Sequence, residues 1–391
     1  MYSTQFLPLL IRHIRVCRFL RSIPTDFDGK SKKLVLITGP FQIAIFRLQL
    51  ILSLGYCVTL FLGLFLGKMS MSKKAQGLVF YSMHIVILAA RWNYSLNNSA
   101  MQVINSAMEF ETQLLQGRPI PKMSLQAKLI KLFVHVVQFT LLVIPLAVFC
   151  LIMFDPCSPP FLLSMSTNCA SIKWDNCGIE IYILIFETWM QAHMFWAGAL
   201  WICFHLFVGV VVMLNYFQVV EQRIHEAKTG HEVEACIKLY RCIQIMEKLL
   251  NAFLMVRIVP VMVAGMPGLQ ILTQYVCIKM HEEISMPGFL IFPLVFGDST
   301  VNNVLVFTLA SWINNISAKV LMQLGNKMVN LDASRMGLSI LRRKIKACTV
   351  LKIKFGSNFI DRGTPLVIQN FCLNQTMTLI LIKSSRLAAK D

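Results

Sequence analysis

Residues 43–66 of the chain have the sequence IAIFRLQLILSLGYCVTLFLGLFL, in which Arg47 is the one charged residue. A helix needs about 20 such residues to cross the roughly 30 Å hydrocarbon core of a bilayer at about 1.5 Å per residue. Six further stretches share this length and apolar character. We therefore expect seven membrane-spanning helices, at residues 43–66, 76–96, 130–153, 193–217, 251–277, 287–312 and 363–382.

The composition of the whole chain agrees with a membrane protein. Of 391 residues, 56% are hydrophobic and 14% are charged, and the mean hydropathy is +0.63. Water-soluble domains are about 45–50% apolar and about 25% charged. The excess of 37 Lys and Arg over 19 Asp and Glu lies between the apolar runs, where the positive-inside rule accounts for it, so we expect no nucleic-acid partner. The expected fold class is an all-α membrane protein.

The basic residues also orient the spans. The segments 1–47, 91–131, 219–257 and 315–362 hold 29 Lys and Arg, whereas the segments on the other side hold 8. Because positive residues concentrate on the cytoplasmic side, we expect the N-terminus, with a basic segment 1–42, in the cytoplasm and the C-terminus outside the cell. G-protein-coupled receptors have the opposite orientation, which argues against that class.

The sequence carries no motif for catalysis or metal binding. No nucleophile elbow, phosphate-binding glycine loop or His-Glu-x-x-His pattern occurs, and the eight histidines are scattered among different segments. We therefore expect no enzymatic activity, no metal and no cofactor. The predicted external loop after the third span holds Cys157, Cys169 and Cys177, two of which can form a disulfide, and the spacing leaves the pairing open.

Aromatic and polar residues gather in the predicted outer halves of the second to sixth spans. Aromatic residues at this depth are lipid-facing anchors in many membrane proteins, and the other interpretation is a small-molecule pocket. Asp298 within the sixth span is either a pocket residue or a contact between helices. The candidate ligand-binding residues are Tyr81, His84, Trp189, His193, Trp196, Gln274, Tyr275 and Asp298.

The last span has the densest row of polar residues. Gln369, Leu373 and Thr376 lie at helical spacing, and a parallel row beginning at Asn370 continues through Asn374 and Thr378. The two rows form one largely polar face, which needs water or hydrogen-bonding helices beside it. It predicts either a pore lined by several copies of this helix or hydrogen-bonded packing within one bundle.

The end of the chain resembles the arthropod gustatory receptors. It contains FGSNFIDR at residues 355–362 and TMTLILIKS at residues 376–384. In that family Gly and Phe precede a turn with Asp or Asn and Arg, and the last helix ends in Thr-Tyr, five mostly aliphatic residues and Gln-Phe. Met377, Lys383 and Ser384 depart from this pattern. With seven spans and an internal N-terminus, the chain resembles the arthropod gustatory and odorant receptor superfamily.

The resemblance implies a ligand-gated, non-selective cation channel of the plasma membrane. A small tastant or odorant would open it, and it would assemble with membrane lipid around it as a homotetramer or a heterotetramer of related subunits. Residues 1–315 would hold the first six spans and an outer-half ligand pocket, and residues 316–391 would form a cytoplasmic anchor segment and the pore-lining seventh helix. Segments near 219–250 and 315–355 would hold the subunits together.

The same resemblance places a gate at Ile380 and a polar position just outside it at Lys383. Four lysines around an outer mouth would repel cations. Lys383 therefore turns toward the lipid headgroups, alters the selectivity, or shows that the alignment slips here. The alternative function is a secondary transporter of a small solute in which Asp298 couples transport to an ion.

Overall fold

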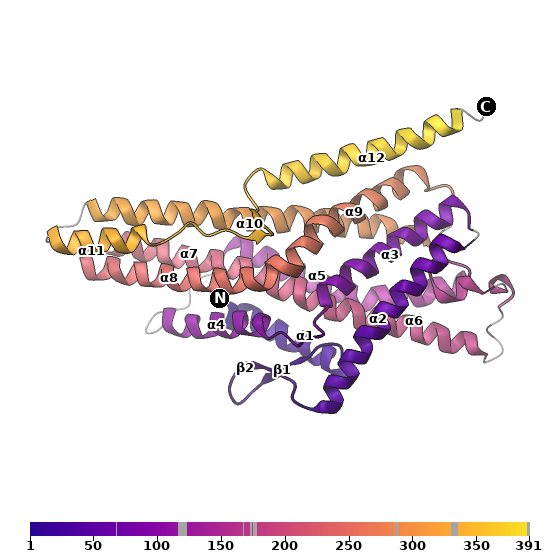
Figure 1. Cartoon of the computed structure of the whole chain (residues 1–391), viewed down its shortest axis with the longest axis horizontal. Helices are drawn as coiled ribbons and strands as arrows, with labels where there is room; N and C mark the ends of the chain where they lie inside the picture. The colour runs from indigo at the N-terminus through magenta and orange to yellow at the C-terminus, as the bar shows by residue number, and fades with distance from the viewer. Residues whose placement is uncertain are drawn as a thin grey trace.

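The computed structural model describes residues 1–67, 69–115, 123–166, 168–172, 174, 178–284, 286, 288–329 and 335–388. In this part of the chain the fold is an elongated bundle of helices (Figure 1). The main helices are α1 (Leu7–Phe19), α2 (Pro40–Leu66), α3 (Met71–Arg91), α4 (Ser99–Leu114), α5 (Leu125–Phe154), α6 (Ile179–Ala199), α7 (Val208–Glu226), α8 (Gly230–Phe253), α9 (Val259–Lys279), α10 (Ile291–Val329), α11 (Arg335–Lys346) and α12 (Thr364–Ala388).

Short helical turns of other types complete the helical part. Two of them, η4 and η5, continue the helices before and after them without a break. The turns are η1 (Tyr2–Phe6), η2 (Leu162–Met165), η3 (Cys169–Ser171), η4 (Leu200–Phe207), η5 (Leu254–Ile258) and η6 (Gly288–Leu290).

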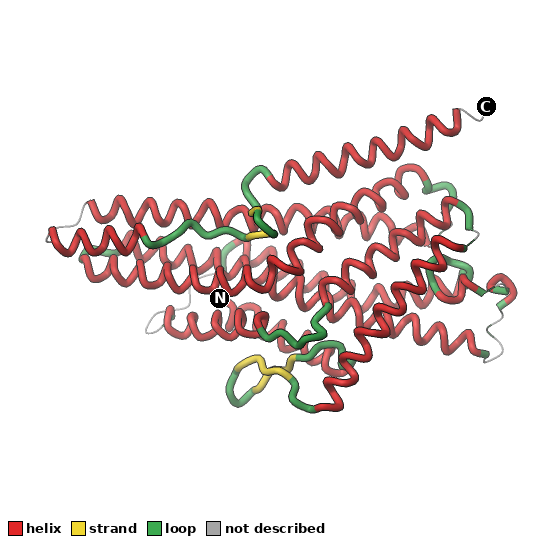
Figure 2. The backbone as a smooth tube through the Cα atoms, in the orientation of Figure 1, coloured by secondary structure: helices red, strands yellow, loops and turns green. Residues whose placement is uncertain are grey.

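Two short hairpins depart from the wholly helical pattern that the sequence predicts (Figure 2). The strand β1 (Thr25–Asp28) pairs antiparallel with β2 (Lys33–Leu36), and β3 (Lys354–Phe355) pairs antiparallel with β4 (Asn358–Phe359). The second hairpin turns at Gly356, whose φ of +55° lies in the left-handed region that glycine adopts without strain. The all-α class is otherwise confirmed.

Six helical stretches of the described chain are long and apolar enough to cross a membrane: Pro40–Leu66, Leu125–Phe154, Ile179–Glu226, Gly230–Lys279, Gly288–Val329 and Thr364–Ile382. They contain six of the seven predicted spans. The remaining one, predicted at 76–96, overlaps α3, which begins at Met71 and ends at Arg91. This helix is less apolar because it carries Lys73, Lys74 and Arg91. Since α3 packs against α2, α6 and α9, its place as a seventh span rests on packing and stays a prediction.

The helix at the fourth predicted span extends beyond the span at both ends. Residues 193–217 form the middle of one continuous helix of 48 residues that consists of α6, η4 and α7. The most apolar stretch of 18 residues in this helix is 94% buried, so other parts of the protein surround it on nearly all sides. Its polar residues Glu187 and Gln191 are hydrogen-bonded inside the bundle, which is why the helix continues through them.

Side chains at the helix ends explain where several helices begin. At α8, the Thr229 hydroxyl accepts a hydrogen bond from the Glu232 N–H, and the Glu232 carboxylate accepts one from the Thr229 N–H. Ser124 caps α5 in a simpler way. Before α12, Asp361 Oδ1 accepts hydrogen bonds from the N–H groups of Gly363 and Thr364, at 3.1 and 2.9 Å.

The helix α9 lies at the centre of the packing. It contacts α3, α10 and α12. Two glycines allow α3 to approach α9 and α6 closely. A Cβ at Gly265 on α9 would lie 2.4 Å from Val86 Cγ2, and a Cβ at Gly198 on α6 would lie 2.9 Å from Ile87 Cγ2. The helix α12 makes its main contacts with α9 and α10 and diverges from the rest of the bundle (Figure 1).

The loops separate to the two ends of the bundle. The α2–α3, α5–α6 and α9–α10 connections lie at the end shown at the right of Figure 1, together with the C-terminus. The α7–α8 junction lies at the opposite end, together with the end of α10 and the beginning of α11. This arrangement agrees with a chain that crosses a membrane repeatedly, and the assignment of one end to the cytoplasm rests on the charge count.

Candidate functional site

A cavity of about 130 Å³ lies between α3, α5, α6, η4, α9 and α10, and it is partly open. Apolar side chains form most of its wall, and the polar side chains are few, as in small-molecule sites. It is lined by Met83, Val86, Ile87, Phe133, Val137, Thr140, Leu141, Ile144, Phe195, Gly198, Ala199, Ile202, Cys203, Met266, Leu269, Val295, Asp298, Ser299 and Asn302.

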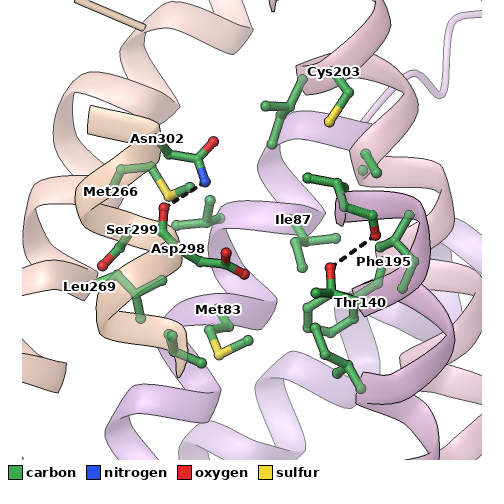
Figure 3. A pocket seen from close by; sticks show the side chains of 18 of the residues that line it. Met83, Ile87, Thr140, Phe195, Cys203, Met266, Leu269, Asp298, Ser299 and Asn302 are labelled. Carbon is green, nitrogen blue, oxygen red and sulfur yellow. Dashed lines mark hydrogen bonds between the residues drawn. The ribbon is translucent and has the colours of Figure 1, made fainter. Parts of the chain in front are cut away.

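Asp298 supplies the one charged group of this cavity (Figure 3). Figure 3 shows its carboxylate directed toward the side of the cavity where Met83 and Ile87 lie. No hydrogen bond or ion pair joins that carboxylate to another of the described residues. It is therefore available to a ligand.

The other polar side chains of the cavity bond to their own helices. Asn302 Nδ2 donates to the Asp298 carbonyl oxygen at 2.8 Å, and Ser299 Oγ donates to a carbonyl one turn earlier at 3.0 Å. Thr140 Oγ1 on α5 donates to the Val137 carbonyl at 2.9 Å. Each hydroxyl or amide oxygen can still accept a hydrogen bond. The cavity therefore offers these neutral oxygens as weak acceptors and the carboxylate of Asp298 as a strong one.

Of the eight residues predicted to bind ligand, Asp298 alone lines this cavity. His84 Nε2 lies 2.8 Å from Gln191 Nε2 in the buried space between α3 and α6. His193 lies 3.3 Å from the Ser53 hydroxyl and stacks on Trp189. The structure therefore places these aromatic and polar residues in the packing between helices.

The remaining predicted ligand residues also contact protein. Tyr81 is half-buried, with its ring centroid 5.8 Å from that of Phe61. The Trp196 carbonyl accepts a hydrogen bond from His13 Nε2 at 2.9 Å. Gln274 Oε1 accepts one from Thr376 at 3.2 Å, and Tyr275 is half-buried beside it on α9.

A buried polar network that the sequence did not predict joins α2, α6 and the loop after α5. The Tyr56 hydroxyl and the Leu162 N–H both donate to the Glu187 carboxylate. Nearby, Arg91 at the end of α3 is 1% exposed and donates to the Ser53 hydroxyl at 3.4 Å. A charged residue within an otherwise apolar helix is the sequence signal that could have indicated this network. The partners of Glu187 and Arg91 could not be predicted, because they come from segments far apart in the sequence.

The predicted pore residues lie on two different sides of α12. Gln369 and Thr376 face α9: Gln369 Oε1 accepts from Gln270 Nε2 at 2.9 Å, and Thr376 is 1% exposed. Asn370 and Leu373 lie on the exposed side. Asn374 and Thr378 continue that side, and Asn374 Nδ2 donates to Asn370 Oδ1 at 3.4 Å.

The end of α12 holds the two predicted gate positions. Ile380 is half-buried. Lys383 belongs to the helix, and its side chain lies outside the described residues.

A disulfide joins Cys157 to Cys169 in the loop between α5 and α6. Cys177 lies outside the described residues. Within the described chain, no three His, Cys, Asp or Glu side chains are positioned to hold a metal ion.

The architecture is similar to two solved structures of the insect olfactory receptor OR5 from Machilis hrabei. With the structure of the complex with eugenol, the TM-score is 0.66 at 11% identity over 98% of this chain and 100% of that chain. The chain has the fold of the insect olfactory receptors. With the other OR5 structure, the TM-score is 0.62 at 12% identity over the same shares.

The shared fold is the one that the resemblance to the gustatory and odorant receptor superfamily implied, and the likeness to gustatory receptors in particular stays a prediction. With six long apolar helices, the chain is a multi-pass membrane protein. Both neighbours are receptors, not enzymes. No family model matches the sequence, and no curated protein sequence matches it.

Proposed function

We propose that the chain is a subunit of a chemoreceptor that acts as a ligand-gated, non-selective cation channel in the plasma membrane. The observation that carries the proposal is the apolar cavity with one free carboxylate, in a chain that shares the olfactory-receptor fold over 98% of its length. Tastant and odorant both remain within the proposal, because a cavity of this kind selects ligands by shape.

The cavity suits a small, mostly apolar molecule with one polar group. Its apolar wall would bury a ring or short aliphatic chain, and Asp298 would accept a hydrogen bond from a hydroxyl or pair with an amine. The olfactory receptor with the same fold was solved with eugenol, a small aromatic compound with a hydroxyl group. Eugenol and related phenols are therefore the first ligands to test.

The exposed side of α12 is the proposed pore lining. Asn370, Asn374 and Thr378 form one polar row there, flanked by exposed apolar residues such as Leu373. In a tetramer, four copies of this row would surround a wetted axis, while Gln369 and Thr376 hold each α12 to its own α9. Ile380 is the proposed hydrophobic gate.

Three side chains connect the cavity to α12. Asn302 and Leu269 line the cavity, and the residues that follow them, Asn303 and Gln270, hydrogen-bond to each other at 2.7 Å. Gln270 also donates to Gln369 on α12. A ligand that shifts α10 or α9 would thus change the position of α12, provided that it binds one arrangement more tightly than the other.

Whole-cell recording of the protein, expressed alone and with related subunits, tests the proposal during perfusion with a panel of small phenols and amines. Ala199→Leu fills the cavity and is expected to raise the half-maximal ligand concentration at least about tenfold. Ala44→Leu makes the same change on an exposed face of α2 and should leave the response unchanged. Equal responses of the two variants would contradict the proposed ligand site.

A secondary transporter is the second candidate, because the carboxylate of Asp298 has no partner among the described residues and could bind a coupling ion. The two functions differ in their response to Asp298→Asn. A channel would keep its ion current with altered ligand preference, whereas a transporter would lose coupled uptake of labelled solute.

A further inference from the structure

A second cavity, of about 500 Å³, lies within the N-terminal segment and shares no lining residue with the ligand site. It is partly open, and it is bordered by the end of α1, the turn that follows it, β1 and the beginning of α2. Three arginines from one stretch of chain line it. The lining residues are Arg15, Arg18, Phe19, Arg21, Ile23, Thr25, Asp26, Ile37 and Gln42.

The charge of this cavity is strongly positive. Arg15, Arg18 and Arg21 line the cavity together with a single carboxylate, that of Asp26, which pairs with Arg18 at 2.9 Å. Two guanidinium charges are left in excess within one small space. Guanidinium groups bind phosphate through paired, planar hydrogen bonds, so the cavity suits a phosphate group better than a carboxylate of lower charge.

Arg21 occupies a backbone position at which glycine is the usual residue. Its φ is +51°, and the bonds from Arg21 N–H to the Arg18 carbonyl and from Ser22 N–H to the Cys17 carbonyl close α1 in a Schellman motif. An L-residue in this left-handed conformation is strained by roughly 1–2 kcal/mol. A glycine at this position would relieve the strain. The presence of arginine instead indicates that its side chain has a function.

The rim of the cavity is apolar and lies where the first span starts. Phe19 is 86% exposed and Phe41 is 70% exposed, and the guanidinium of Arg21 lies 5.7 Å from the centre of the Phe41 ring. Phe41 is the second residue of α2, which is long and apolar enough to cross the membrane. Exposed phenylalanines beside a basic cavity would enter the bilayer interface, which a site for a soluble phosphate does not require.

We propose that this cavity binds the phosphorylated headgroup of an anionic lipid. On the predicted topology the site faces the cytoplasmic leaflet, which carries the anionic lipids, and the two phenylalanines would contact the acyl region while the arginines hold the phosphates. The cavity is separate from the proposed ligand site, so the inference stands or falls independently of the channel function.

The purified full-length protein in nanodiscs of phosphatidylcholine, with or without phosphatidylinositol bisphosphate, provides the test. The first readout is the phosphoinositide retained per protein, measured by mass spectrometry. Arg21→Gly removes the side chain while relieving the backbone, so a folding defect is not expected. Arg15→Gln removes a second charge of the cavity, and Arg12→Gln removes an exposed charge of α1 outside it.

We expect Arg21→Gly and Arg15→Gln each to lower retention about fivefold, since one basic residue near an anionic membrane contributes about that factor. Arg12→Gln should change retention by less than about twofold. Equal losses in all three variants would show a general effect of charge and would overturn the proposal, as would unchanged retention in Arg21→Gly.

A second arm distinguishes the lipid from free phosphate compounds. In detergent, a short-chain phosphatidylinositol bisphosphate should raise the melting temperature of the wild type at concentrations at least about tenfold below those needed of soluble inositol trisphosphate. Equal potency of the two compounds would contradict a lipid site, because it would mean that the apolar rim contributes nothing.

Discussion

Gln270 on α9 and Gln369 on α12 are joined by a hydrogen bond of 2.9 Å from Nε2 to Oε1. The same Gln270 accepts a hydrogen bond from Asn303 on α10, so one side chain connects three helices. This cluster, together with the hydrogen bond from Thr376 to Gln274, fixes α12 against α9 beside the cavity.

Gln270→Leu is expected to destabilise the protein. The change leaves the buried amide of Asn303 and the amide of Gln369 without their partner, at a cost of about 1–3 kcal/mol for each buried polar group. The thermal midpoint in detergent should fall by several degrees. Gln375→Leu, on the exposed side of α12, is the matched control, and a midpoint as high for Gln270→Leu as for this control would contradict the role of the cluster.

Two glycines of the long helix that contains α6 and α7 should respond differently to alanine. At Gly198 a Cβ would meet Ile87 Cγ2 at 2.9 Å, so Gly198→Ala should push α3 away at a cost of about 1–3 kcal/mol. At Gly209 the nearest atom, Leu250 Cδ1, would be 3.4 Å away, and Gly209→Ala should gain up to about 1 kcal/mol of helix propensity. Thermal midpoints of both variants give the comparison, and a loss at Gly209 as large as at Gly198 would argue against close packing of α3 on α6.

His13 should make the stability depend on pH. Burial lowers the pKa of His13 to about 4, although its hydrogen bond to the Trp196 carbonyl raises it. The unfolded chain, with a histidine pKa near 6.5, binds a proton between pH 6.5 and 4 that the folded chain does not bind. Stability should therefore fall as the pH falls through this window, by up to about 3 kcal/mol.

Unfolding midpoints at pH 7.5, 6 and 5 measure this effect. In His13→Phe, the drop between the first and last pH should be smaller than in the wild type. His231→Phe, at an exposed position on α8, should behave as the wild type does. An identical pH response of wild type and His13→Phe would show that the histidine is not buried in its neutral form.

A cysteine at position 374 should detect water at the exposed side of α12. If this side lines a pore, the thiol of Asn374→Cys ionises and reacts with a charged methanethiosulfonate reagent, and the ligand-evoked current falls. The native Cys372 on the same helix is fully buried and serves as an internal control in the wild type. Normal current in Asn374→Cys with no reaction would mean that this side faces lipid.

The sequence predicted the apolar helices well because lipid imposes one requirement on each of them. It predicted their ends poorly. The helix at the fourth span runs from Ile179 to Glu226, beyond the predicted 193–217, because Glu187 and Gln191 find partners inside the bundle. The β1–β2 hairpin depends on contacts such as that of Asn105 with the Leu34 backbone, which no local pattern indicates.

The cavity could be predicted only in part, for a related reason. Asp298 was visible as a charge in an apolar helix, and it does line the cavity. Residues such as Val137, Ala199 and Ile202 have no feature that separates them from other apolar helix residues, and they meet only because five helices cross at particular angles. Conversely, His84 and His193 were predicted to contact a ligand. The sequence does not show that other residues of the protein already hydrogen-bond to both rings.

The central claim is that copies of α12 meet around a common axis with Asn370, Asn374 and Thr378 toward it. Electron cryo-microscopy of the purified assembly, viewed along the membrane normal, tests this claim most directly because it needs no known ligand. The account predicts four subunits with α12 innermost and this polar row facing the axis. A monomer, or an assembly in which α12 lies at the outer edge against lipid, would contradict it.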